Sequence, residues 1–120
     1  MKPYRLELTV PGLPPMNTAT TRRHWSHGAK VAARWRQIIA ALVGRKKPAV
    51  PLPFAIVTLT RCSSVEPDYD NLVMSCKPVI DALKHAGVVL DDKSKHLVRH
   101  YGWEYSPRGK GQLRIVIEQD

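Results

Sequence analysis

The hydrophobic pattern of the chain changes from that of a β-strand to that of a helix within its first 42 residues. Residues 4–10 alternate apolar and polar side chains, which predicts a half-buried strand. After a segment rich in helix breakers and small polar residues, 13–28, which we interpret as a functional loop, apolar residues recur at the spacing of one helix face: Val31, Trp35, Ile38 and Leu42. Gly44 and Pro48 are typical of a helix end.

The rest of the chain continues this pattern. Residues 54–60 are almost entirely apolar or β-branched, which suits a strand covered on both faces. A second helix is predicted over 70–86, ended by Gly87, although Pro78 leaves open whether it kinks or begins near Lys77. A short strand over 88–90 and two longer strands over 97–105 and 113–118, around a turn, complete the pattern. We predict one α+β domain over residues 1–120, with two main helices packed on a mostly antiparallel or mixed sheet of about four to five strands.

Charge is divided unevenly between the two halves of the chain. The formal net charge is +9, and residues 1–60 hold ten Lys and Arg against one acid, Glu7. Residues 61–120 hold nine basic and nine acidic residues. A basic surface binds phosphate through counterion release, so the first half favours a nucleic-acid partner. Acids gathered in the second half repel phosphate unless metal ions lie between them.

Several classes of protein are not expected. The longest uncharged stretch, 48–60, is thirteen residues interrupted by three prolines, whereas a transmembrane helix needs about 20 apolar residues. No membrane partner is therefore expected. The N-terminus has no apolar core of secretory type, and two cysteines are too few for a disulfide framework. We expect a cytoplasmic protein.

The acids around residue 68 form the pattern most typical of chemistry. Pro67 favours extended backbone before it, and in an extended segment Asp68 and Asp70 project to the same side. On a helix from Asp70 onward, charged residues share one stripe with Met74, and apolar residues share the opposite one. A charged stripe is commonly just a solvated face. The added aspartates at 68, 91 and 92 favour a hard cation such as Mg²⁺, which prefers oxygen ligands.

These motifs resemble the RusA family of Holliday-junction resolvases, which are often prophage-encoded. Residues 68–72 read DYDNL, residues 77–83 read KPVIDAL and residues 87–92 read GVVLDD, similar to the family's DxDNL, KxxxDAL and GxxxDD. The early LPPMN at 13–17 is similar to the family's proline-proline-x-asparagine segment. The resemblance implies that Asp68, Asp70 and Asp92 bind the metal, that Lys77 is the catalytic lysine, and that Asp81 is a further acid of the motif. Which of Asp91 and Asp92 points inward rests on the resemblance alone.

The lysine departs from the family's spacing. The family places it four residues after the second Asp of DxD, where this chain has Met74, and Lys77 lies at seven. Positions four and seven share a helix face, so Lys77 is predicted to take the role one turn further on.

The resemblance implies a crossover junction endodeoxyribonuclease that acts as a homodimer in DNA recombination and repair. It would hydrolyse phosphodiester bonds of four-way junction DNA with one or two Mg²⁺ ions, or with Mn²⁺ as a substitute. The candidate DNA-binding residues are polar or basic residues of the first half: Asn17, Arg22, Arg23, Lys30 and Arg34. An alternative is a non-catalytic basic module, such as a phage regulatory or RNA-binding protein, whose acidic stripe is only a helix cap and a solvated face.

Overall fold

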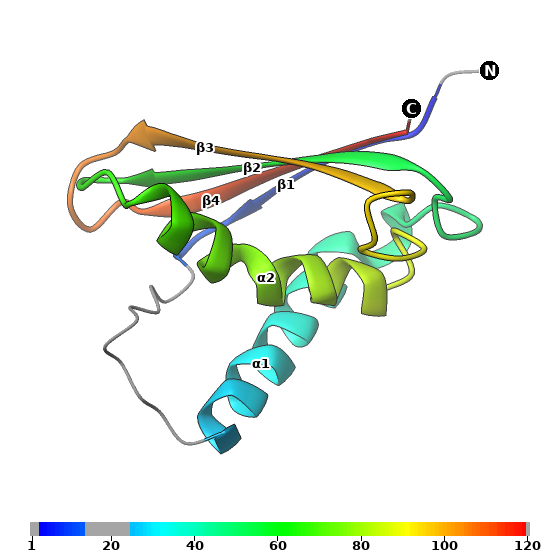
Figure 1. Ribbon diagram of the computed structural model, residues 1–120, viewed down its shortest axis with the longest axis horizontal. Helices are drawn as coiled ribbons and strands as arrows, with labels where there is room; N and C mark the ends of the chain where they lie inside the picture. The colour runs from blue at the N-terminus through cyan, green and yellow to red at the C-terminus, as the bar shows by residue number, and fades with distance from the viewer. Residues whose placement is uncertain (1–2, 14–24, 120) are drawn as a thin grey trace.

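Two helices cover one face of a four-stranded sheet, and no other described element covers the opposite face, which is called the open face below (Figure 1). The computed structural model describes residues 3–13 and 25–119. The strands are β1 (Arg5–Val10), β2 (Ala55–Ser63), β3 (Leu97–Tyr105) and β4 (Gln112–Gln119), and their order in the sheet is β1-β4-β2-β3. The β2–β3 pair is parallel and the other two pairs are antiparallel. The predicted α+β class, with a mixed sheet and two main helices, is confirmed.

Alternating burial follows from the period-two pattern of the sequence. In β1 the side chains of Leu6, Leu8 and Val10 are buried, and those between them are exposed. Leu8 lies opposite Ile115 of β4, which lies opposite Leu59 of β2, so one buried row crosses three strands. These rows form the floor on which the helices pack.

Strand β2 has one covered face, so the expectation of cover on both faces was wrong. Ala55, Val57 and Leu59 are completely buried, whereas Ile56 and Thr58 between them are only partly buried. The apolar run of the sequence was read as a sign of cover on both faces. Such a run does not establish this, because β-branched side chains also suit a half-exposed strand.

Helix α1 (Trp25–Val43) begins inside the segment interpreted as a loop. The loop prediction is therefore wrong for residues 25–28, and residues 14–24 lie outside the described part of the chain. Of the predicted apolar stripe of α1, Trp35 is buried, whereas Val31, Ile38 and Leu42 are only partly buried. The other buried positions are Ile39 and Val43, each one residue further along the helix than predicted. Gly44, at φ 51°, ends the helix as predicted, and the chain continues into the 3₁₀ turn η1 (Gly44–Lys46).

Helix α2 (Tyr69–His85) runs continuously through Pro78, which excludes a start near Lys77. Its end is the predicted glycine: Gly87 has φ 81°, its N–H donates to the carbonyl of Lys84, and the next N–H, of Val88, donates to Leu83. This pair of bonds is a Schellman motif. The helix buries its predicted apolar stripe against the sheet and α1: Leu72, Cys76, Val79 and Leu83.

The predicted strand at 88–90 forms only one parallel bridge, between Val89 and Leu52. Leu52 lies between Pro51 and Pro53, and because proline has no N–H, this segment cannot extend the ladder. The bridge holds the turn that carries Asp91 and Asp92 beside α2. Strands β3 and β4 are not neighbours, because β2 lies between them.

Candidate functional site

Two carboxylates flank the start of α2. Asp68 is the residue immediately before the helix, and its carbonyl accepts the N–H of Leu72, which starts the helical ladder. Its side chain makes no capping hydrogen bond, and Asp70 lies in the first turn. Both residues are exposed. Two carboxylates therefore lie at the positive end of the α2 dipole, where negative charge is favoured.

A second group of charged side chains lies further along α2, around Lys77. Its Nζ is 3.9 Å from Oδ2 of Asp92 and 4.0 Å from Oδ1 of Asp81. Asp81 is one turn ahead on the same helix, whereas Asp92 comes from the turn that follows the Val89 bridge. The fold thus brings the motif at 87–92 into contact with Lys77 of the motif at 77–83.

Asp91 and Asp92 point to different partners. The Asp91 carboxylate accepts the backbone N–H of Asp92 at 2.7 Å and lies 3.2 Å from Nζ of Lys84. These two interactions lower the pKa of Asp91 to about 2, and the backbone hydrogen bond has the larger effect. Asp91 therefore stabilises the turn, and Asp92 is the member of the pair that faces Lys77.

The acids form two groups along α2. Asp70 and Lys77 lie on the predicted stripe, but seven residues of helix separate them by about 10 Å along the axis. Within residues 3–13 and 25–119, no three His, Cys, Asp or Glu side chains are arranged to hold one metal ion. Asp68 and Asp70 are exposed and Asp92 is partly buried. Their carboxylate oxygens have the donor chemistry that Mg²⁺ and Mn²⁺ prefer, although their positions divide them between the two groups.

A pocket of about 400 Å³ adjoins the first group of acids. It lies between the start of α2 and the C-terminal half of β3, and both Asp68 and Glu66 line it. Three aromatic residues line the same pocket: Tyr69, Tyr101 and Trp103. Sequence reasoning missed this site. The available signal was the spacing of Tyr101 and Trp103, which puts both rings on one face of a strand.

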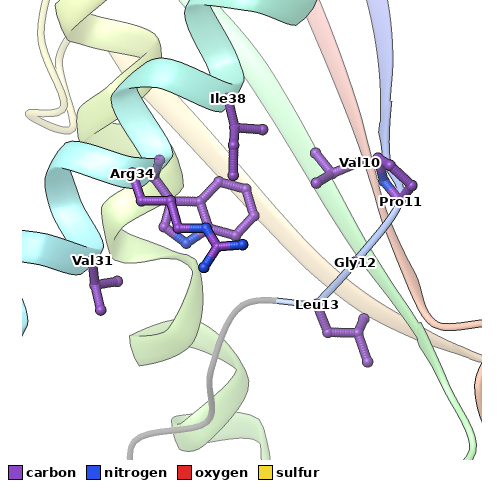
Figure 2. Close-up of a pocket in the computed structure, with 8 residues that line it drawn as sticks. Val10, Pro11, Gly12, Leu13, Val31, Arg34 and Ile38 are labelled. Atoms are coloured by element: carbon purple, nitrogen blue, oxygen red, sulfur yellow. The ribbon is translucent and has the colours of Figure 1, made fainter.

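Basic side chains of α1 lie on the helix side of the sheet. Lys30 and Arg34 are exposed there, as predicted, and α1 contains no acidic residue. Arg34 also lines a pocket of about 430 Å³ between α1 and the end of β1, where Figure 2 shows its side chain among those of Val31, Ile38 and Val10. The other candidate DNA-binding residues, Asn17, Arg22 and Arg23, lie outside the described residues.

The open face of the sheet carries several ion pairs between arginine and glutamate side chains. Arg5 pairs with Glu7 at 2.8 Å and with Glu118 at 3.2 Å, and Arg114 pairs with Glu104. These arginines are matched by acids on their own face, so they are less available to a polyanion than the exposed cations of α1.

Replacing Asp91 with asparagine should lower the stability of the fold slightly at neutral pH and make no difference in strong acid. Asparagine keeps an oxygen that accepts the Asp92 N–H but loses the charge that pairs with Lys84. The folded pKa of about 2 lies below the unfolded value of about 4, so the ionised carboxylate stabilises the fold above pH 4, and this contribution is lost as the pH falls toward 2. Urea midpoints of both proteins between pH 7 and pH 2.5 test this, and an undiminished difference at pH 2.5 would contradict it.

Comparison with models of known protein families finds no match, and comparison with curated proteins finds none either. In the part of the chain that the structure describes, no helix combines the length and the apolar character needed to cross a membrane.

Proposed function

We propose that this protein is a divalent-metal-dependent endonuclease that resolves four-way DNA junctions, as its RusA-like motifs imply. The observation that carries the proposal is the contact of Lys77 with Asp92. These residues belong to separate motifs, fifteen positions apart, and a solvated charged stripe would not require the turn at residue 92 to return to the helix. The contact supports a shared task for the two motifs.

Each residue is given the role that its motif implies. Asp68, Asp70 and Asp92 would hold one or two metal ions, which when bound lower the pKa of a water and offset the charge that develops on the phosphate. The Lys77 ammonium would hold the scissile phosphate and stabilise its growing negative charge. Lys77 is exposed and its present partners are 3.9 and 4.0 Å away, so these ion pairs are weak and a phosphate can replace them. Asp81 keeps Lys77 oriented toward the site.

The charge of the helix layer supports a nucleic-acid substrate. The exposed cations of α1 and η1 lie in the same layer as the acids of α2, so DNA backbone held by Lys30, Arg34 and Arg36 would pass close to them. A four-way junction has two-fold symmetry and is cut twice, which a homodimer with one site in each subunit matches. We place such an enzyme in the bacterial cytoplasm, encoded by a bacterium or its prophage.

Cleavage assays on three DNA structures test the proposal. A mobile four-way junction, a replication fork and a plain duplex, each end-labelled, are incubated with the protein in Mg²⁺, in Mn²⁺ and in EDTA. We expect paired nicks in the junction only, with either metal, and none in EDTA. Binding should survive EDTA, because the cations of α1 carry it. Equal cutting of all three substrates would contradict junction selectivity and would indicate a general nuclease. Junction binding without cutting in either metal would favour the non-catalytic module.

A further inference from the structure

The pocket beside Asp68 has aromatic walls that are held in place by contacts with neighbouring residues and with each other. The indole N–H of Trp103 donates to Oγ of Ser63 at 2.9 Å, and that hydroxyl donates to the carbonyl of Val65 at 2.8 Å. Tyr69 and Tyr101 meet edge to face, with ring centroids 6.3 Å apart. Tyr101 and Trp103 are two residues apart on β3, so their side chains stand side by side about 7 Å apart. The rings are therefore preorganised to receive a flat ligand.

The polar lining of the pocket restricts what the ligand can be. Glu66 and Asp68 both contribute to the wall, and both are exposed. Carboxylates repel phosphate, so a phosphate group is a poor occupant. They accept hydrogen bonds, so a planar group that carries an amino donor is a good one. A volume of about 400 Å³ falls in the range of about 300–1,000 Å³ typical of small-molecule sites.

The surroundings of the pocket favour a nucleic-acid base over a free small molecule. Arg99 precedes the two aromatic residues on β3, and Arg108 and Lys110 follow in the turn after the strand. All three are exposed. Arg99 lies two residues before Tyr101, on the same side of the strand, so it is available to a phosphate that flanks a base in the pocket. Bases stack readily on aromatic side chains, and a carboxylate can accept the amino group of cytosine or adenine.

We propose that this pocket takes one unstacked base of the bound DNA and thereby sets where the strand is cut. This inference rests on the proposed junction endonuclease. Asp68 lines the pocket and also belongs to the candidate metal ligands, so a base held there places its own backbone beside the catalytic acids. Trp103 and Tyr69 provide the stacking surfaces, and Glu66 accepts the amino group. Thymine has no amino group and is disfavoured.

A binding cycle that pairs side-chain removal with base removal tests this directly. Junctions with a single abasic nucleotide at each position around the crossover are bound to wild-type protein and to Trp103→Ala in EDTA, and affinity is measured by fluorescence anisotropy. At one position, base loss should weaken wild-type binding about tenfold, because stacking on an aromatic side chain is lost. Trp103→Ala should bind the intact junction about as weakly as the wild type binds the abasic one. Removing the base should then not weaken the binding of Trp103→Ala any further.

Two variants serve as controls for Trp103→Ala. Trp103→Phe keeps a ring but loses the bond to Ser63, so it should retain most of the base effect. Tyr105→Ala removes an exposed aromatic residue two positions further along β3 that does not line the pocket, and it should bind like the wild type. In Mg²⁺, Glu66→Gln should lose discrimination against thymine at the position found by the abasic scan.

The outcomes separate this inference from the proposed function. If the wild type cuts junctions but the effects of Trp103→Ala and base loss are additive, or no position is sensitive, the base pocket is wrong and the endonuclease stands. If the coupling appears but no junction is ever cut, the pocket binds a base and the endonuclease is wrong. Aromatic rings beside carboxylates also suit a quaternary ammonium ion. Saturable binding of tetramethylammonium that Trp103→Ala removes, without coupling to base loss, would overturn the proposal.

Discussion

Asp70→Asn should abolish junction cleavage, by about a thousandfold or more, while junction binding stays within about twofold of the wild type. Asparagine has nearly the shape of aspartate but lacks the charge that a hard divalent cation requires. Removing the metal's contribution takes away both the activated water and the charge stabilisation, and each of these is worth several kcal/mol. The fold should be unaffected, because Asp70 is exposed on the first turn of α2.

The measurement is single-turnover cleavage of a labelled junction, with anisotropy binding in EDTA on the same preparation. Glu7→Gln provides the matched control, because Glu7 is an exposed acid on the open face, paired only with Arg5 in an exposed contact. It should cut at the wild-type rate. An Asp70→Asn protein that cleaves at the wild-type rate would remove Asp70 from the metal site and favour a solvated helix face.

Lys77→Met should lower kcat about a hundredfold and change KM little. The expected loss follows from removing one preorganised positive charge from the transition state, and such groups are commonly worth a factor of about 10²–10³. Methionine keeps the length of the side chain without the charge. Lys84→Met is the matched control on the same helix, because Lys84 pairs with Asp91, the acid that stabilises the turn. Steady-state kinetics on a junction substrate would separate the two lysines.

A second substitution tests the shifted spacing of the lysine. Met74 occupies the position that the family pattern gives to lysine, and its side chain is 55% exposed, so a charged residue fits there. We expect Lys77→Met with Met74→Lys to remain impaired, because the contact with Asp92 comes from position 77. Recovery of the wild-type rate in the double variant would instead place the phosphate one turn earlier, nearer to Asp70. An unchanged rate in Lys77→Met alone would contradict a catalytic role for this lysine.

Local patterns predicted most of the fold because local physics decides these elements. The end of α2 at Gly87 follows from a left-handed conformation that glycine adopts at little cost. Alternation predicted β1, and the helical stripe predicted the buried Trp35. The start of α1 was missed because its first turn contains small, polar and aromatic residues without an apolar period. Pro78 left the start of α2 open, and the continuous helix shows that packing of Val79 and Leu83 outweighs the lost backbone bond.

The candidate site was only partly predictable from its motifs. The spacing placed Asp70, Lys77 and Asp81 on one face of a helix, and the structure has them there. The motifs left the choice between Asp91 and Asp92 to the resemblance, and the structure directs Asp91 to Lys84 and Asp92 to Lys77. The aromatic pocket was missed because its walls come from the residues before α2 and from a strand more than thirty positions later.

The sequence by itself determined the strand and helix order, the buried stripes, the basic first half and the acidic motifs, because each depends on residues that are neighbours along the chain. The tertiary structure alone decided the parallel pairing of β2 with β3, the cover of only one sheet face, the return of Asp92 to Lys77, and the pocket between α2 and β3. These depend on contacts between segments distant in sequence. Such contacts form because they bury apolar surface across the whole domain, and this cannot be read from the pattern of neighbouring residues.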